Sequence, residues 1–172
     1  YSIAHFFATA SHSKWFTNTL FVITADHTSE AIMPEYNNDY GLYRIPIIIY
    51  DPTRNLSQYS DQKPAQQIDL MPTLLSYLNY QKPVFCFGVN LLDTTLERFA
   101  INYKQPDYQI INSQYLLKFN GEKTTAIYNI LEDKTLSKNM ISLYPEDKKK
   151  LEMRLKAFIQ QYNHALIYNK MQ

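Results

Sequence analysis

Two uninterrupted apolar runs near the start of the chain are typical of buried strands. The first covers residues 20–25, is rich in β-branched and aromatic side chains, and stops abruptly at two polar residues. The second covers residues 45–50. Residues 3–10 and 67–80 instead repeat their apolar positions at helical spacing. This succession of helices and strands predicts an α/β fold that contains part of a parallel sheet.

Past the middle of the chain the pattern changes to short runs rich in Tyr, Ile and Phe. We expect strands of a small antiparallel sheet at residues 99–103, 108–111, 115–119 and 125–130. Asn120-Gly121, between the last two runs, is a strong hairpin signal. Helical spacing returns over residues 145–169 and predicts a terminal helix. We therefore divide the chain into an α/β part, residues 1–95, and a part with the antiparallel sheet and C-terminal helix, residues 96–172.

Composition limits the class of protein. Apolar residues make up 45% of the chain and charged residues 19%, which is ordinary for a globular protein and unlike a disordered one. A formal net charge of +1 gives no electrostatic case for nucleic acid as a partner. No apolar run approaches the roughly 20 residues of a membrane span. Cys86, the single cysteine, excludes an internal disulfide and a thiolate metal cluster, and we expect it to be a buried structural residue.

The candidate chemistry lies at Asp26 and His27, where the first predicted strand ends. Open α/β sheets place their ligands just beyond the carboxyl ends of strands. Neighbouring side chains on a strand point to opposite faces, so these two can serve one site only if the backbone turns there. A carboxylate and an imidazole suit a divalent ion, although two groups do not complete a metal site. The alternative is a capping Asp beside a half-exposed His.

Several ordered motifs resemble the sulfatase-like members of the alkaline phosphatase superfamily. Residues 13–27, SKWFTNTLFVITADH, are similar to the connector and strand that end in A/G-D-H in that family. Residues 43–48 resemble the family's R-V/I-P element, residues 67–75 its D-x-x-P-T-L element and residues 87–92 its G-x-x-L-L element. Residues 127–140 resemble the ending of sulfatases. The resemblance implies an α/β fold: the C-terminal portion of an alkaline-phosphatase-like sheet, then a small antiparallel sheet and a terminal helix.

The resemblance also implies a metal-dependent enzyme that acts on sulfate or phosphate esters. Asp26 and His27 match the family's paired ligands for a divalent ion, which could be Mn, Mg, Ca or Zn. Arg44 matches a frequent family arginine that either binds substrate or forms a structural salt bridge. The loop of residues 28–43 would border the active site and help to set specificity.

Within the superfamily the pattern is most similar to the lipoteichoic-acid-synthase-like group. Those enzymes are anchored in a membrane and transfer a phosphoglycerol-type head group outside the cytoplasm through a threonine, whereas sulfatases proper use an oxidised Cys or a Ser. Neither nucleophile motif nor the family's N-terminal acidic ligand occurs in this chain, so it supplies no catalytic residue that we can name. The resemblance places both in the half of the protein that would precede Tyr1.

Because the chain opens on Tyr1 rather than Met, we expect it to be a piece of a longer protein. We expect such a piece to be soluble and to be inactive alone. It should bind the missing N-terminal half of the same protein and should tend to self-associate through uncovered strand edges. The alternative is a non-catalytic folding or binding module in which Asp26 and His27 are vestigial. A nucleophile motif and an acidic ligand upstream of Tyr1 would support the enzyme, and their absence would support the module.

Overall fold

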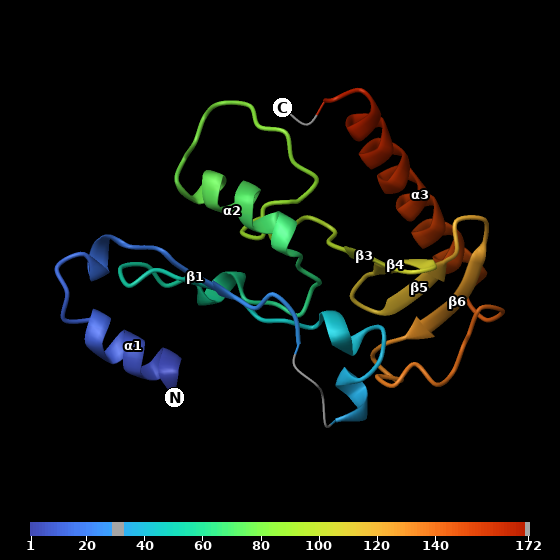
Figure 1. Cartoon of the computed structure of the whole chain (residues 1–172), viewed down its shortest axis with the longest axis horizontal. Coiled ribbons are helices and arrows are strands. Elements are labelled where there is room, and N and C mark those ends of the chain that lie inside the picture. The colour runs from blue at the N-terminus through green and yellow to red at the C-terminus, as the bar shows by residue number, and fades with distance from the viewer. Residues whose placement is uncertain (29–32, 171–172) are drawn as a thin grey trace.

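The structure is a computed structural model that describes residues 1–28 and 33–170. Its α-helices are Ser2–Ala10 (α1), Leu70–Tyr77 (α2) and Pro145–Ile167 (α3). Its strands are Phe21–Thr24 (β1), Ile47–Tyr50 (β2), Ala100–Lys104 (β3), Asp107–Ile111 (β4), Tyr115–Phe119 (β5) and Thr124–Asn129 (β6). β1 and β2 form a two-stranded sheet, and β3, β4, β5 and β6 form a four-stranded sheet in that order (Figure 1). Within the described ranges, no helix has both the length and the apolar character of a membrane span.

The four-stranded sheet confirms the antiparallel strands that the sequence predicts. Each strand pairs with the next in antiparallel register. The β5–β6 hairpin turns through Asn120 and Gly121, and Gly121 has φ +97°, a conformation that a residue without a Cβ adopts readily. The terminal helix α3 lies across one face of this sheet (Figure 1). Its side chains and the strands together bury the main apolar core: Ile110, Tyr115, Leu117, Phe119, Ile127, Leu151 and Leu155.

The opposite face of the four-stranded sheet is covered by the segment of residues 33–44, which forms two short 3-10 turns, Pro34–Tyr36 and Gly41–Tyr43. Tyr40 packs there against a second apolar cluster of Ile111, Leu116 and Ile130. In Figure 1 this segment (cyan) and α3 (red) lie on opposite sides of the sheet. The sheet is therefore buried on both faces.

The two-stranded sheet corrects two of the expectations from the sequence. β1 and β2 are antiparallel, with Thr24 opposite Ile47, so the prediction of a parallel sheet was wrong for this pair. The reason is the connection: its described residues, 25–28 and 33–46, form two 3-10 turns and no α-helix, whereas parallel neighbours need a crossover of the βαβ kind. The strands are also not buried, since exposed and half-buried positions alternate along both of them.

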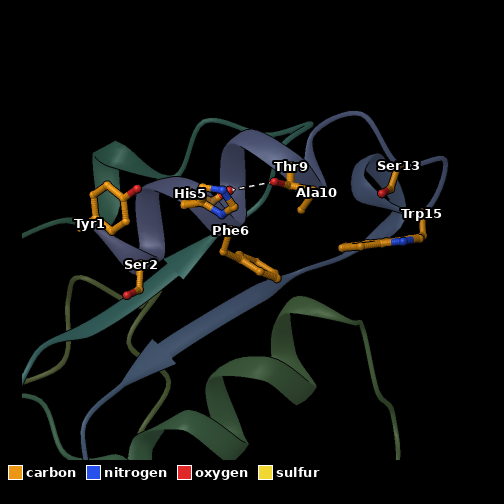
Figure 2. A pocket seen from close by; sticks show the side chains of 8 residues that line it. All are labelled: Tyr1, Ser2, His5, Phe6, Thr9, Ala10, Ser13 and Trp15. Carbon is orange, nitrogen blue, oxygen red and sulfur yellow. Dashed lines mark hydrogen bonds between the residues drawn. The ribbon is translucent and has the colours of Figure 1, made fainter.

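Helix α1 covers one face of the two-stranded sheet with aromatic side chains, and it confirms the helix expected near the start of the chain. The ring centroid of Phe7 lies 5.0 Å from that of Phe21 and 5.5 Å from that of Tyr50. Residues of α1 and of the turn after it line a shallow hollow, in which Phe6 points from the helix towards β1 and Trp15 lies at the end (Figure 2). This aromatic layer explains the half-burial of β1 on that face only.

Asp69 connects the start of α2 to the segment that follows it. The helix confirms the prediction for residues 67–80 but is shorter, with a 3-10 turn, Gln67–Asp69, before α2. The Asp69 carboxylate is 2% exposed and accepts hydrogen bonds from the backbone N–H of Gln66 at 2.8 Å and of Val89 at 2.9 Å. A Cβ on Gly88 would lie 2.1 Å from the carbonyl oxygen of Ile68, so only glycine allows this close approach.

The segment after α2 also holds Cys86, which the sequence led us to expect in the core. Cys86 is only half-buried, and its Sγ lies 3.6 Å from the carbonyl oxygen of Gly88. It lies in residues 81–99, which contain no helix or strand. The expectation of a buried residue was therefore wrong.

Asp51 joins the end of β2 to α2. Its carboxylate accepts a short hydrogen bond from the Tyr77 hydroxyl and further bonds from the side chain and backbone N–H of Thr53. The Tyr77 bond, followed by those from Thr53, lowers the pKa of Asp51 from 3.8 to about 2. The charged carboxylate is therefore the form that the native state favours.

Leu155→Ala tests the placement of the core. We expect the free energy of unfolding to fall by about 2–5 kcal/mol, because the substitution leaves a cavity under α3 where Leu155 is 0% exposed. Met153→Ala, on the same helix at a side chain that is 57% exposed, should change it by less than about 0.5 kcal/mol. Chemical denaturation followed by circular dichroism measures both, and equal losses would contradict this core.

Tyr77→Phe tests the bond to Asp51. In the native protein the lowered pKa contributes stability above pH 4, and this contribution is lost as the pH falls through about 2. Without the hydroxyl we expect the pKa of Asp51 to rise towards 3.8, so that the contribution shrinks. NMR titration of the Asp51 carboxyl carbon measures this shift. Tyr80→Phe, at an exposed ring, is the control, and an unchanged pKa in Tyr77→Phe would rule out the bond.

Candidate functional site

The end of β1 presents Asp26 and His27 at a bend in the backbone. The Gln67 side chain donates a hydrogen bond of 2.9 Å to the carbonyl oxygen of Ala25, which fastens this strand end to the turn before α2. Because the chain bends here, the two neighbouring side chains turn towards each other, and His27 Nε2 lies 3.5 Å from Asp26 Oδ2. The structure thus brings together the pair that the sequence singles out.

Local hydrogen bonds fix the form of His27. Its backbone N–H donates to Asp26 Oδ1 at 2.9 Å, and its ring Nδ1 lies 2.8 Å from the carbonyl oxygen of Thr28. A carbonyl can only accept, so Nδ1 carries the proton and Nε2 is left as the free nitrogen in the neutral ring. The Thr28 bond, followed by the charge of Asp26, raises the pKa of His27 above 6.5.

The pair fits part of a metal site. A nitrogen and an oxygen that lie 3.5 Å apart can both reach one ion at the usual bond lengths of about 2.0–2.2 Å. Metal-bound histidines commonly donate their other ring N–H to a carbonyl, as His27 does to Thr28. Over residues 1–28 and 33–170, however, no group of three or more His, Cys, Asp or Glu side chains could hold an ion. The side chains are 77% and 87% exposed, so further ligands have room to approach.

Arg44 lies in a stack of aromatic rings. Its guanidinium carbon is 4.9 Å from the centroid of Tyr36 and 5.2 Å from that of Tyr40. No ion pair among the described residues includes Arg44, and two cation–π contacts hold its guanidinium there.

Arg44 and the Asp26–His27 pair occupy the same end of the two-stranded sheet. The last pair of the ladder is Thr24 with Ile47, and beyond it the Thr28 hydroxyl donates to the carbonyl oxygen of Leu42 at 3.0 Å. These two contacts bracket residues 25–27 on one side and 43–46 on the other. Residues 29–32 of the loop expected to border the site lie outside the described residues.

Sequence reasoning missed the tyrosines that support Arg44. Tyr36 and Tyr40 meet its guanidinium only because two 3-10 turns fold residues 33–44 back on themselves. No local periodicity marks such a fold. Sequence reasoning also assigned no role to Asp69, although this residue lies in the segment that resembles the D-x-x-P-T-L motif.

The comparison with known protein families gives a match over the first part of the chain. Residues 1–80 match the family model described as Sulfatase. A 2,3-bisphosphoglycerate-independent phosphoglycerate mutase from Gracilaria tenuistipitata var. liui is 32% identical over 81 residues, which are 45% of this chain and 16% of that protein. The chain therefore spans a small part of this curated relative.

Comparison with solved structures extends the likeness to almost the whole chain. The structure of BT4656 in complex with its substrate, D-glucosamine-2-N,6-O-disulfate, matches with a TM-score of 0.69 at 17% identity. The match covers 94% of this chain and 38% of BT4656. It confirms the predicted α/β fold class, and the structure adds that both sheets are antiparallel. The chain therefore shares the fold of BT4656, and its residues 1–80 match the Sulfatase family model.

Proposed function

We propose that this chain supplies two ligands, Asp26 and His27, to the divalent metal centre of a sulfuric or phosphoric ester hydrolase. The observation that carries the proposal is the 3.5 Å approach of Asp26 Oδ2 to His27 Nε2, inside the segment that matches the Sulfatase family. A carboxylate oxygen and an imidazole nitrogen suit Mn, Mg, Ca or Zn to different degrees, and the pair does not select among them.

The residues of the chain have distinct roles in this proposal. The Thr28 carbonyl holds the tautomer in which His27 presents Nε2, and Asp26 contributes negative charge beside it. Arg44 offers fixed donors to an anionic ester oxygen from its tyrosine stack. When bound, the metal ion supplies polarisation of the ester and stabilises the charge that develops as the bond breaks.

The proposed reaction also needs a nucleophile. The chain has no C/S-x-P-x-R sequence, and Cys86 lies in the segment after α2, in no such context. The proposal therefore assigns the nucleophile and the remaining ligands to another part of the enzyme. The chain covers 38% of BT4656, and β1 and β2 bury no side chain. Both observations support the proposal that further strands of the same fold pack against β1 and β2 in the whole enzyme. A second copy of this chain is the alternative covering.

A sulfate ester is the substrate class that we favour, because the family model describes sulfatases and BT4656 has a sulfated sugar as its substrate. The phosphoglycerate mutase relative supports a phosphate ester as the second candidate. Phosphoglycerol transfer by a membrane-anchored enzyme outside the cytoplasm belongs to this second candidate and rests on the resemblance of the motifs alone.

Titration with Mn²⁺ tests the metal ligands. We expect selective paramagnetic broadening of the backbone amide signals of residues 26–28 at pH 8, and weaker broadening at pH 5.5, where protonated His27 cannot ligate. Asp26→Asn and His27→Gln should each remove most of the effect. His5→Gln, which alters a histidine on α1, is the control and should leave it unchanged. Broadening that persists in both site variants would favour the non-catalytic module.

Hydrolysis assays test the assignment of the nucleophile. With Mn²⁺ present, we expect the 172-residue chain to hydrolyse neither aryl sulfate nor aryl phosphate above the buffer rate, because a displacement needs a nucleophile that this chain does not supply. A chromogenic release assay measures both rates. Turnover that disappears in the His27→Gln variant would overturn this part of the proposal.

A further inference from the structure

Asp39 fastens the segment of residues 33–44 to the four-stranded sheet. Its Oδ1 accepts a hydrogen bond of 2.5 Å from Lys104 Nζ at the end of β3, and its Oδ2 accepts one from Lys118 Nζ in β5. Burial alone would raise the pKa of Asp39, but the two lysines together outweigh it and lower the pKa. The carboxylate is therefore charged near neutral pH.

This contact is shielded from solvent better than an ordinary surface ion pair. The Lys118 side chain is 18% exposed and that of Asp39 is 26% exposed. Gln109, opposite Lys118 in the strand register, is 1% exposed. Partly buried pairs are screened by salt much less than exposed ones.

The residues on either side of Asp39 anchor the same segment. The Asn38 side chain donates a hydrogen bond of 2.9 Å to the carbonyl oxygen of Lys134 and accepts bonds from the backbone N–H of Tyr40 and Gly41. Tyr40 packs on the apolar cluster of the sheet. Tyr40 thus takes part in two contacts, because its ring also forms half of the stack beneath Arg44.

We propose that Asp39 is a positioning residue for anion recognition. By fastening the segment to Lys104 and Lys118 it holds Tyr40 on the sheet. Tyr40 and Tyr36 in turn fix the guanidinium of Arg44, a residue that precedes β2 at the same end of the two-stranded sheet as Asp26 and His27. Arg44 then binds an oxygen of the sulfate group without first having to be ordered. This inference rests on the proposed function, because it takes Arg44 as a group that contacts the ester.

Titration of the whole chain with sodium sulfate, at constant ionic strength set by sodium chloride, tests the inference. We expect a saturable shift of the Arg44 Nε–H signal in the NMR spectrum of the native chain. Asp39→Asn should weaken the apparent affinity at least about fivefold, because the stack is no longer held in place. Asp39→Glu keeps the charge and should restore most of the affinity.

A matched control is available at Glu97, which also binds two basic side chains, Arg154 at 2.7 Å and Lys150 at 3.3 Å. Glu97→Gln removes a comparable clamp that does not touch residues 33–44, and it should leave sulfate binding unchanged. If Asp39→Asn does not fold, Lys118→Met removes one of the two donors while it keeps the apolar stem, and it should weaken binding in the same direction.

The outcomes separate this inference from the proposed function. A native chain whose Arg44 signal does not respond to sulfate would overturn the role of Arg44 in both, while the Mn²⁺ titration would still report on Asp26 and His27. A native response that is equally strong in Asp39→Asn and Lys118→Met would overturn the positioning role alone.

Discussion

The burial of the four-stranded sheet under α3 is the interaction on which the rest of the structure depends. In the described part of the chain, Ala10, Phe16 and Leu91 are the buried apolar residues that precede residue 96. The first part of the chain therefore has little core of its own, and it is held by apolar contacts and hydrogen bonds to the second. The Gln66 amide, for example, donates to the carbonyl oxygen of Phe99 at 3.0 Å and accepts from the backbone N–H of Ile101 at 2.8 Å.

The parts of the fold that the sequence predicted correctly are those that local pattern determines. The strands β3 to β6 lie within one or two residues of the expected runs, because each has a turn signal at its end and pairs with its neighbour in sequence. The direction of β1 against β2 was predicted wrongly, since it depends on the path of a long connection. The burial of these strands depends on what packs against them, which an apolar run does not specify.

The candidate site, too, could be predicted from the sequence only in part. Asp26 and His27 are adjacent in sequence, so the pattern of a strand that ends on an acid and an imidazole was enough to find them. Their roles as metal ligands, the role of Arg44 and the division of the chain near residue 95 stay predictions. The support of Arg44 could not be predicted, because Asp39 and Lys118 are 79 residues apart and no local rule pairs them.

The anchoring of the segment 33–44 also sets an order of events in folding. Its contacts join residues that are 65, 79 and 96 positions apart, whereas the hairpins of the four-stranded sheet close over a few residues. Closing long loops costs more chain entropy and is slower than forming hairpins. The sheet must exist before Asn38 and Asp39 have a surface to bind, so this segment docks after the sheet has formed. By the same path in reverse the segment is released while the sheet remains folded, so its amide hydrogens should exchange faster than those of the sheet.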